Sequence, residues 1–365
     1  MQKTLIGKKV FLTGHTGFKG SWLALWLQTL GATVTGYSLA ATSRPSHFEL
    51  LREQGLLKIE SVIGNICDLE SLKRAMLVCD PDLIIHMAAQ PIVLQSYRDP
   101  IETYETNVMG TLKVFEAARA LNSGNLRGIV NVTSDKCYEN RETLIGYKET
   151  DPMGGYDPYS SSKGCAEILF SSYQRSFFPI EKYKTQHQVL MASVRAGNVI
   201  GGGDWAPDRL IPDLIRAAKE KRVAEIRNPS AIRPWQHVLE PLAGYLQVAA
   251  QLLAGNTSVA TGFNFGPDEA SCVTVGELLA SLQEKWDGIS YILGEAPKVH
   301  EAHFLKLDST KARTELAWMP RLNFEETIEW TANWYRSQQE SNRLLTEEQL
   351  TVYVRKLVPN AGTRA

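Results

Sequence analysis

The segment KKVFLTGHTGFKG (residues 8–20) decides the fold class. Its apolar first half predicts a short buried strand, and apolar residues at helical spacing in the segment 20–31 predict a helix directly after it. Three glycines stand between them at G-x-x-G-x-x-G spacing: Gly14, Gly17 and Gly20. Such glycines permit a tight turn, the approach of a pyrophosphate and close helix–strand packing. The context favours dinucleotide binding over a glycine-rich turn that holds no ligand.

Strands and helices alternate over the first 200 residues. Further apolar strands are expected at 32–39, 61–68, 81–89, 129–134 and 188–201, and helices at 68–77, 100–121 and 157–178. Strands that are apolar on both faces indicate a parallel sheet covered by helices on each side. We therefore predict an α/β fold, a Rossmann-like doubly wound parallel sheet with a smaller C-terminal α/β substrate-binding domain.

The alternation stops near residue 200. Loop-like stretches follow, with helices expected at about 208–221, 238–254, 274–286 and 323–341. We place a dinucleotide-binding domain at residues 1–200 and a mainly substrate-binding region at 201–357, with the segment 230–265 as the candidate for a return to the first domain.

Composition excludes several classes of function. The net charge of −1 gives no electrostatic sign of a nucleic-acid or membrane partner. No apolar run is long enough to cross a bilayer, and the N-terminus has no signal-like segment, so a cytoplasmic protein is expected. The five cysteines have no C-x-x-C spacing, which predicts reduced thiols and no metal site.

The second strand leaves the choice of dinucleotide open. The acid that would bind the ribose of NAD is missing there, and Ser38, Thr42, Ser43 and Arg44 stand in that region instead. Arg44 would accept the 2′-phosphate of NADP, so NADP stays open beside NAD. Asp68 follows the third strand, where it would contact adenine or simply cap the next helix.

Two groups of polar residues follow further along the chain. The strand in IVNVTSDKCY (129–138) ends in Ser134, Asp135 and Lys136. Tyr159 and Lys163 lie four apart at the start of a predicted helix and so share one face. An ammonium beside a phenol lowers the pKa of the phenol, which could then accept a proton from an alcohol during hydride transfer.

The motifs together resemble the extended short-chain dehydrogenase/reductase superfamily. GHTGFKG, HMAAQ (86–90), TNVMGT (106–111), VTSDKCY and YSSSK carry the resemblance, which extends to LDSTKARTELAWMPR (307–321). Within the superfamily the chain is most similar to nucleotide-sugar 4,6-dehydratases, in particular those of CDP-glucose. The resemblance implies bound NAD and cofactor contacts from Gly14, Thr16, Gly17, Phe18, Lys19, Asp68, Ala88, Ala89, Gln90, Asn107, Tyr159 and Lys163.

The same resemblance implies a three-stage dehydration. Tyr159 would take the proton of the sugar 4-hydroxyl, assisted by Lys163 and by a hydrogen bond from Ser134. Water would then leave across C5 and C6, and the hydride would return to C6. The dTDP-glucose enzymes carry Asp-Glu where this chain has Asp135 and Lys136. We expect Asp135 to protonate the leaving hydroxyl and Lys136 to act as a neutral base at C5. The alternatives are a cationic Lys136 that stabilises the enolate, or a structural salt bridge.

Two loops are expected to hold the nucleotide diphosphate. The resemblance assigns the substrate contacts to Asn198, Arg209 and Arg233, with His300 and Glu301 as weaker candidates at the nucleotide end. A guanidinium binds phosphate bidentately, which suits Arg233. Trp235 would pack near the base or fill the interface. The preference for cytosine rests on the resemblance alone.

Two other functions remain open from the sequence. A nucleotide-sugar 4-epimerase shares Ser134, Tyr159 and Lys163 but has no use for Asp135–Lys136. A non-catalytic dinucleotide-sensing regulator has no use for the Tyr–Lys pair. In this superfamily the helices corresponding to 100–121 and 157–178 form a dimer interface, so a homodimer or homotetramer is expected. The expected pathway is the synthesis of O-antigen sugars for lipopolysaccharide.

Overall fold

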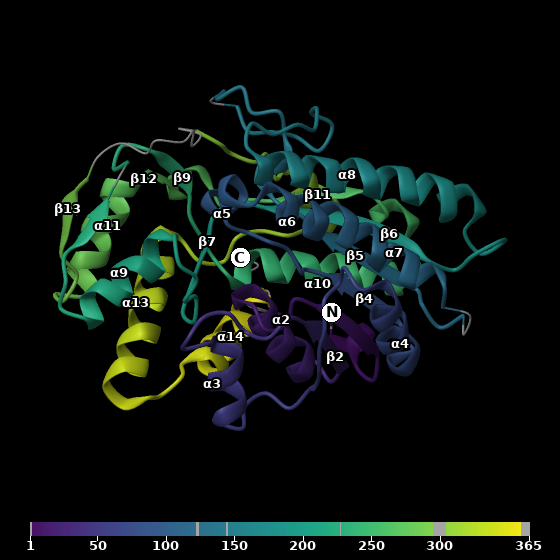
Figure 1. The fold of residues 1–365 in the computed structure, drawn as a ribbon, viewed down its shortest axis with the longest axis horizontal. Coiled ribbons are helices and arrows are strands. Elements are labelled where there is room, and N and C mark those ends of the chain that lie inside the picture. Colours follow the sequence, from purple (N-terminus) through teal and green to yellow (C-terminus); the bar gives the residue numbers. More distant parts are fainter. Residues whose placement is uncertain (1, 122–123, 144, 227, 295–303, 359–365) are drawn as a thin grey trace, which may run out of the picture.

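A parallel sheet forms the centre of the molecule. The computed structural model describes residues 2–121, 124–143, 145–226, 228–294 and 304–358. Within these residues seven strands pair in the order β11–β6–β5–β4–β1–β2–β3 (Figure 1). They are β1 (Lys9–Thr13), β2 (Thr33–Ser38), β3 (Glu60–Ile63), β4 (Leu83–His86), β5 (Gly128–Val132), β6 (Leu190–Ala196) and β11 (Gly262–Phe265). Every pairing is parallel, which confirms the predicted Rossmann-like doubly wound sheet.

Helices cover both faces of the sheet because successive strand residues point to opposite sides. In β1, Phe11 packs into one buried cluster, and Val10 and Leu12 pack into the other. The face of Phe11 is covered by α4 (Leu69–Cys79), α7 (Thr111–Arg119) and α8 (Pro158–Phe177). The opposite face is covered by α2 (Phe18–Thr29) and α10 (Leu239–Leu253).

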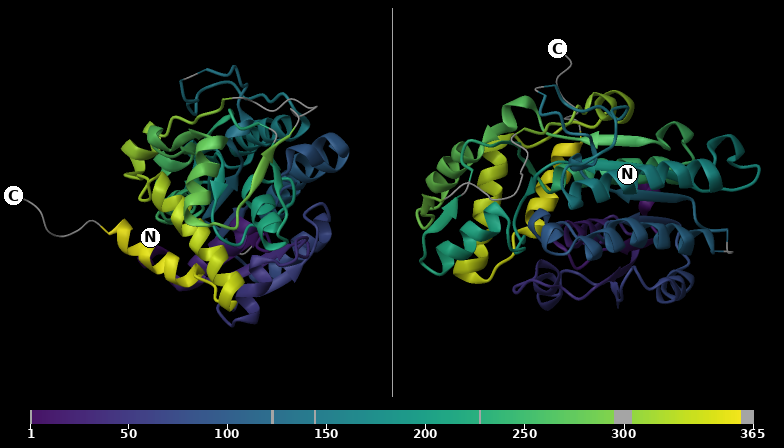
Figure 2. Two further views of the ribbon diagram at one scale, coloured as in Figure 1. Left: turned by 90° about the vertical axis from the view of Figure 1, so that its left-hand side faces the viewer. Right: turned by 45° about the horizontal axis from the view of Figure 1, so that its top comes forward.

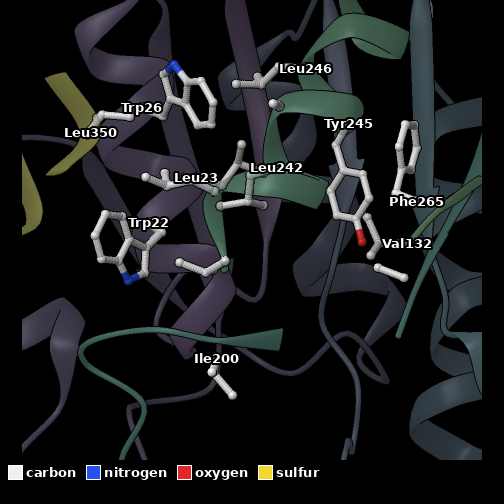
Figure 3. Close-up of a cluster of buried hydrophobic side chains, with 14 of the residues drawn as sticks. Trp22, Leu23, Trp26, Val132, Ile200, Leu242, Tyr245, Leu246, Phe265 and Leu350 are labelled. Atoms are coloured by element: carbon white, nitrogen blue, oxygen red, sulfur yellow. The ribbon is translucent and has the colours of Figure 1, made fainter. Parts of the chain in front are cut away.

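The helix that follows the glycine loop is buried on nearly every side. Residues 20–27 of α2 are all buried, since the sheet, α10 and α14 (Thr346–Leu357) surround them. A helix that is apolar all round needs such a position. Figure 3 shows Trp22 and Trp26 of α2 close to Leu242 of α10 and Leu350 of α14. This packing fixes the start of α2, which carries the glycine loop.

A second lobe lies at one end of the sheet, at the left of Figure 1. It contains α9 (Leu210–Lys219), α11 (Val275–Lys285) and α13 (Phe324–Ser341), the pair β8 (Ala224–Ile226)–β13 (Tyr291–Leu293) and the pair β9 (Ile232–Pro234)–β12 (Cys272–Thr274). The pair β7 (Val199–Ile200)–β10 (Gln236–His237) adjoins it. These three helices and α10 confirm the four helices predicted after residue 200 to within a few residues.

The chain beyond residue 200 also returns to the central sheet. Strand β11 pairs with β6, and α10 packs on β5 and β6. Both elements lie within or beside the segment 230–265. The C-terminal helix α14 packs against α2, and Figure 2 shows these C-terminal helices (yellow) beside the N-terminal part (purple). The domain bounds at residues 1–200 and 201–357 stay a prediction.

The predicted helix 100–121 is built from three parts. Helix α6 (Pro100–Tyr104) runs into a π-helical turn at Glu105–Gly110 and then into α7. Short helices complete the fold: α1 (Gln2–Leu5), α3 (His47–Glu53), α5 (Val93–Arg98) and α12 (Thr310–Leu316). None of the helices in the described ranges combines the length and apolar content needed to span a membrane.

Candidate functional site

A cleft of about 1370 Å³ runs along the carboxyl ends of the central strands and into the second lobe. The loops after β1, β2, β4, β5 and β6 line one part of it, and α9 and β8 line the other. Ligands of doubly wound α/β proteins bind at this edge of the sheet. The cleft is therefore the candidate site.

The glycine loop forms one end of the cleft. At two of its glycines, neighbouring atoms leave no room for a side chain. Gly14 has φ +79°, and a Cβ there would lie 2.8 Å from the backbone nitrogen of Ala88. A Cβ on Gly20 would lie 2.0 Å from the carbonyl oxygen of Gly14. Gly17 lines the cleft and has only one such neighbour, at 3.4 Å, so its missing side chain leaves room for a ligand. The loop fits a pyrophosphate held at the start of α2.

Most residues predicted to bind the cofactor line this end of the cleft. They are Gly14, Thr16, Gly17, Phe18, Lys19, Ala88 and Ala89, together with Tyr159 and Lys163 further along. Three others do not line it: Asp68, Gln90 and Asn107. Asp68 caps α4 by accepting a hydrogen bond from the backbone nitrogen of Ser71 at 3.1 Å.

Gln90 and Asn107 are bonded to each other instead of facing the cleft. The Asn107 side chain accepts a hydrogen bond from the Gln90 backbone nitrogen at 2.8 Å and donates to its carbonyl oxygen at 3.0 Å. Both residues are buried. The Asn107 side chain thus holds the loop after β4 in place, and direct contact of Gln90 and Asn107 with the cofactor stays a prediction.

A buried pair that the sequence analysis missed supports the same loop. Thr13 Oγ1 lies 2.7 Å from His86 Nδ1 and accepts hydrogen bonds from the backbone nitrogens of Met87 and Ala88, each at 3.1 Å. Burial lowers the pKa of His86 to about 3, so its imidazole is neutral. The pair fixes Ala88 against Gly14 and so shapes the floor of the cleft.

Lys19 reaches inward from the glycine loop. Its ammonium donates to the hydroxyl of Tyr245 on α10 at 3.0 Å. Burial lowers the pKa of Lys19 to about 7, and the charges of Arg209 and Lys163 add to this effect. The charge of Asp135 opposes it. Lys19 therefore belongs to the electrostatic environment of the central part of the cleft as well as to the loop.

A short 3₁₀ turn, Asp135–Cys137, follows β5 and lies at the centre of the cleft. The Ser134 side chain caps this turn by accepting a hydrogen bond from the Lys136 backbone nitrogen at 3.3 Å, and it donates to Asp135 Oδ1 at 2.8 Å. Lys136 Nζ lies 3.9 Å from the same oxygen. The structure thus brings the predicted hydroxyl, acid and amine together at one point.

Helix α8 brings Tyr159 and Lys163 to the same place. Asp157 caps the helix, accepting from the Ser160 backbone nitrogen at 3.0 Å, so the first turn faces the cleft. Burial lowers the pKa of Lys163 to about 8, and the charge of Glu167 opposes that fall.

The pKa of Tyr159 departs from the prediction. We expected Lys163 to lower it, but burial raises the pKa of Tyr159 to about 12 because the buried phenolate loses its hydration. A hydrogen bond with Ser134 and the charge of Arg209 oppose the rise only in part. Spacing on a helix shows which groups share a face, but it does not show how deeply they are buried.

The predicted substrate residues line the second part of the cleft where the structure describes them. Asn198, Arg209, Arg233 and Trp235 all do so. Arg209 Nη1 lies 3.1 Å from Asp204 Oδ2, and Arg233 Nη1 donates to the backbone oxygen of Ile232 at 3.0 Å. His300 and Glu301 lie outside the described residues. The cleft wall also includes Trp205, Arg216 and Asn228, which the sequence analysis did not single out.

These features define a class of protein. A Rossmann-like sheet, a glycine loop, and Ser134, Tyr159 and Lys163 at one cleft are the arrangement of short-chain dehydrogenases/reductases. The chain belongs to the GDP-mannose 4,6-dehydratase family, whose model matches residues 11–331. The resemblance found in the sequence is thereby confirmed.

Individual relatives agree with this assignment. The chain is 51% identical over 332 residues to the CDP-glucose 4,6-dehydratase of Salmonella typhimurium, with 91% of each chain covered. It is 26% identical over 349 residues to the dTDP-glucose 4,6-dehydratase of Shigella flexneri, covering 90% of this chain and 92% of that one.

Solved structures of more distant proteins share the fold. The dTDP-glucose 4,6-dehydratase DesIV of Streptomyces venezuelae, with NAD and TYD bound, has a TM-score of 0.75 at 22% identity, covering 90% of this chain and 97% of that one. The UDP-glucose 4-epimerase of Thermotoga maritima has a TM-score of 0.76 at 19% identity, covering 91% and 99%. At such identities the likeness concerns the fold alone.

Proposed function

We propose that the chain is an NAD-dependent lyase that converts CDP-glucose to CDP-4-dehydro-6-deoxyglucose and water. The adjacent Asp135 and Lys136 beside Ser134 carry the proposal, because an elimination needs an acid and a base on one side of the sugar. The chain is 51% identical to the Salmonella CDP-glucose enzyme over 91% of its length, and this identity supports the choice of substrate.

The residues of the glycine loop suit the cofactor. Gly17 leaves space at the start of α2, and Thr16 Oγ1 lies 2.9 Å from Ser38 Oγ, which draws the end of β2 toward the loop. Arg44, the residue that would favour NADP, is not part of the cleft lining, whereas Ser43 is. NAD is therefore the proposed cofactor. When bound, it would accept a hydride from C4 of the sugar and return it to C6.

The protein residues move the protons of the reaction. Tyr159 takes the proton of the 4-hydroxyl in its phenolate form, which is the minor form at a pKa of about 12. The proton leaves as C4 becomes a ketone, and Ser134 holds that oxygen. The ketone acidifies the C5–H bond. A base removes the C5 proton while Asp135 gives a proton to the 6-hydroxyl, which leaves as water. C5 regains a proton when C6 receives the hydride.

Lys136 has two proposed roles at the elimination step. As a neutral amine it removes the C5 proton; as a cation it stabilises the enolate and another group removes the proton. Its contact with Asp135 at 3.9 Å is compatible with both roles. Asn198 is proposed to contact the diphosphate, and Arg209 and Arg233 to lie near phosphate or ribose.

One incubation tests the proposed function. Purified protein with CDP-glucose and NAD should form a ketone that absorbs in alkali, without net formation of NADH. Deuterium placed at C4 should be recovered at C6 of the product. Recovery of CDP-galactose would establish an epimerase instead, and the absence of turnover with any nucleotide sugar would favour a regulator.

We further propose that the chain forms a homodimer or homotetramer through α6, the π-helical turn and α8. An apolar hollow there is lined by Pro100, Ile101, Tyr104, Glu105, Val108, Met109 and Cys165. Ile101 is 71% exposed and Met109 is 45% exposed, which is costly in water. Ile101→Asp should reduce the mass found by light scattering, whereas exposed Ile63→Asp on β3 should not. We also propose that the protein is cytoplasmic and that it acts in O-antigen synthesis.

A further inference from the structure

A buried ion pair lies directly behind the catalytic turn, which is formed by residues 133–138. Glu167 Oε2 of α8 and Arg195 Nη2 of β6 are 2.7 Å apart, and their side chains are 2% and 6% exposed. Charges at this depth are tolerated only when each is bonded to fixed partners. Neither residue lines the cleft, and the proposed mechanism uses neither. The pair therefore needs an explanation of its own.

Each member of the pair holds one end of the turn formed by residues 133–138. Glu167 Oε1 accepts a hydrogen bond from Thr133 Oγ1. Arg195 Nη1 donates to the Tyr138 hydroxyl at 2.5 Å, and the guanidinium lies over the Tyr138 ring, 5.2 Å from its centroid. The residues between these two attachment points are Ser134, Asp135, Lys136 and Cys137.

The pair also joins the turn to the helix that carries the redox residues. Glu167 lies on α8 one turn after Lys163, which lies one turn after Tyr159. The Tyr138 hydroxyl donates in turn to Asn264 Oδ1 of β11 at 2.8 Å. The turn is thus attached to α8, β6 and β11 by side chains that are all buried.

We propose, on the basis of the function proposed above, that the Glu167–Arg195 pair is a positioning device that fixes the turn 133–138 against α8. The elimination groups of the turn and the redox groups of the helix act on one sugar ring in succession. An error of about 1 Å in such an arrangement costs on the order of 10²-fold in rate. Charge-assisted hydrogen bonds are short and directional, so they suit this task.

Two matched variants separate positioning from plain stability. Thr133→Val and Ser193→Ala each remove one hydroxyl that donates to Glu167 Oε1, the second at 2.6 Å, and both keep the ion pair with Arg195. Only Thr133 lies on the catalytic turn, because Ser193 lies on β6. Tyr138→Phe removes the attachment at the other end of the turn and should act as Thr133→Val does.

The expected result differs between the matched variants. Thr133→Val should lower kcat about tenfold or more at an unchanged KM, and Ser193→Ala should keep kcat within about twofold. Both should lower Tm by similar amounts. Hydrogen exchange of the peptide 129–138, measured without substrate, should become faster in Thr133→Val but not in Ser193→Ala.

Two results would overturn the inference. One is a loss of kcat that follows Tm equally in Thr133→Val and Ser193→Ala. The other is unchanged hydrogen exchange of the peptide 129–138 in Thr133→Val. If the wild-type protein does not convert CDP-glucose, the proposed function fails, but the exchange comparison still decides whether the pair holds the turn.

Discussion

Glu167→Gln would test how the negative charge of Glu167 affects the pKa of Lys163. Burial lowers the pKa of Lys163 to about 8, and the charge of Glu167 is the foremost influence that raises it. Glutamine keeps the size of the side chain but removes this charge. The pKa of Lys163 should therefore fall further.

The size of the shift follows from the position of both groups on α8. Side chains four residues apart on a helix lie about 5–6 Å apart. Two unit charges at about 6 Å interact by roughly 3 kcal/mol at an effective dielectric constant of about 20, or about two pKa units. The pKa of Lys163 would move from about 8 to roughly 6. At pH 7 its protonated fraction would fall from about nine tenths to about one tenth.

The assay is the pH dependence of kcat, followed through the ketone product. Activity that needs protonated Lys163 is present at low pH and is lost as pH rises through its pKa. The alkaline limb of the profile should move about two units lower in Glu167→Gln, whereas Ser193→Ala should keep the wild-type limb. Unpaired Arg195 should also cost about 3–5 kcal/mol of stability, so Tm must be measured at each pH. An alkaline limb that stays at the wild-type pH in a folded variant would refute the reasoning.

Three further variants test other parts of the molecule. Lys136→Ala should lower kcat by about 10²-fold or more, and an unchanged rate of ketone formation would remove both of its proposed roles. Gly20→Ala places a Cβ 2.0 Å from the Gly14 carbonyl oxygen, so calorimetry should show loss of NAD binding; unchanged affinity would contradict the structure of the loop. Burial raises the pKa of Glu240 to about 7, above its value in the unfolded chain. Its contribution to stability is thus present below about pH 4.5 and lost as pH rises through about 7, a fall of about 3 kcal/mol. Glu240→Gln should remove this fall in urea titrations at pH 5 and pH 8, and an unaltered pH dependence would argue against it.

The parts of the site that the sequence predicted are those whose signals are local. Gly14, Gly17 and Gly20 lie close together in the sequence, and Tyr159 and Lys163 lie one helical turn apart. Residues this close in the sequence also lie close together in the folded protein, so their spacing predicts the geometry directly. The alternation of strands and helices predicts the sheet for the same reason.

Residues with several possible hydrogen-bond partners are harder to assign from the sequence. Asn107 and Gln90 occur in motifs typical of the family, and the Asn107 side chain bonds the backbone of Gln90. Asp68 caps α4, which is one of the two roles expected for it. A carboxylate or an amide at the end of a strand has both local and distant partners available. The sequence gives the donor and acceptor but not the choice between partners.

The role of Glu167 shows why the remaining part was not predictable. Its bonds join residues 34, 26 and 28 positions away in the chain, and they form only because β5 and β6 pair in a particular register. A lysine four residues before a glutamate would otherwise be taken for an ordinary helical ion pair. In the structure this carboxylate influences both the place of the catalytic turn and the charge of Lys163. Thr133→Val changes the first alone, whereas Glu167→Gln changes both and also breaks the ion pair with Arg195. The shift of the alkaline limb, which Thr133→Val should not show, therefore separates the charge of Lys163 from the place of the turn.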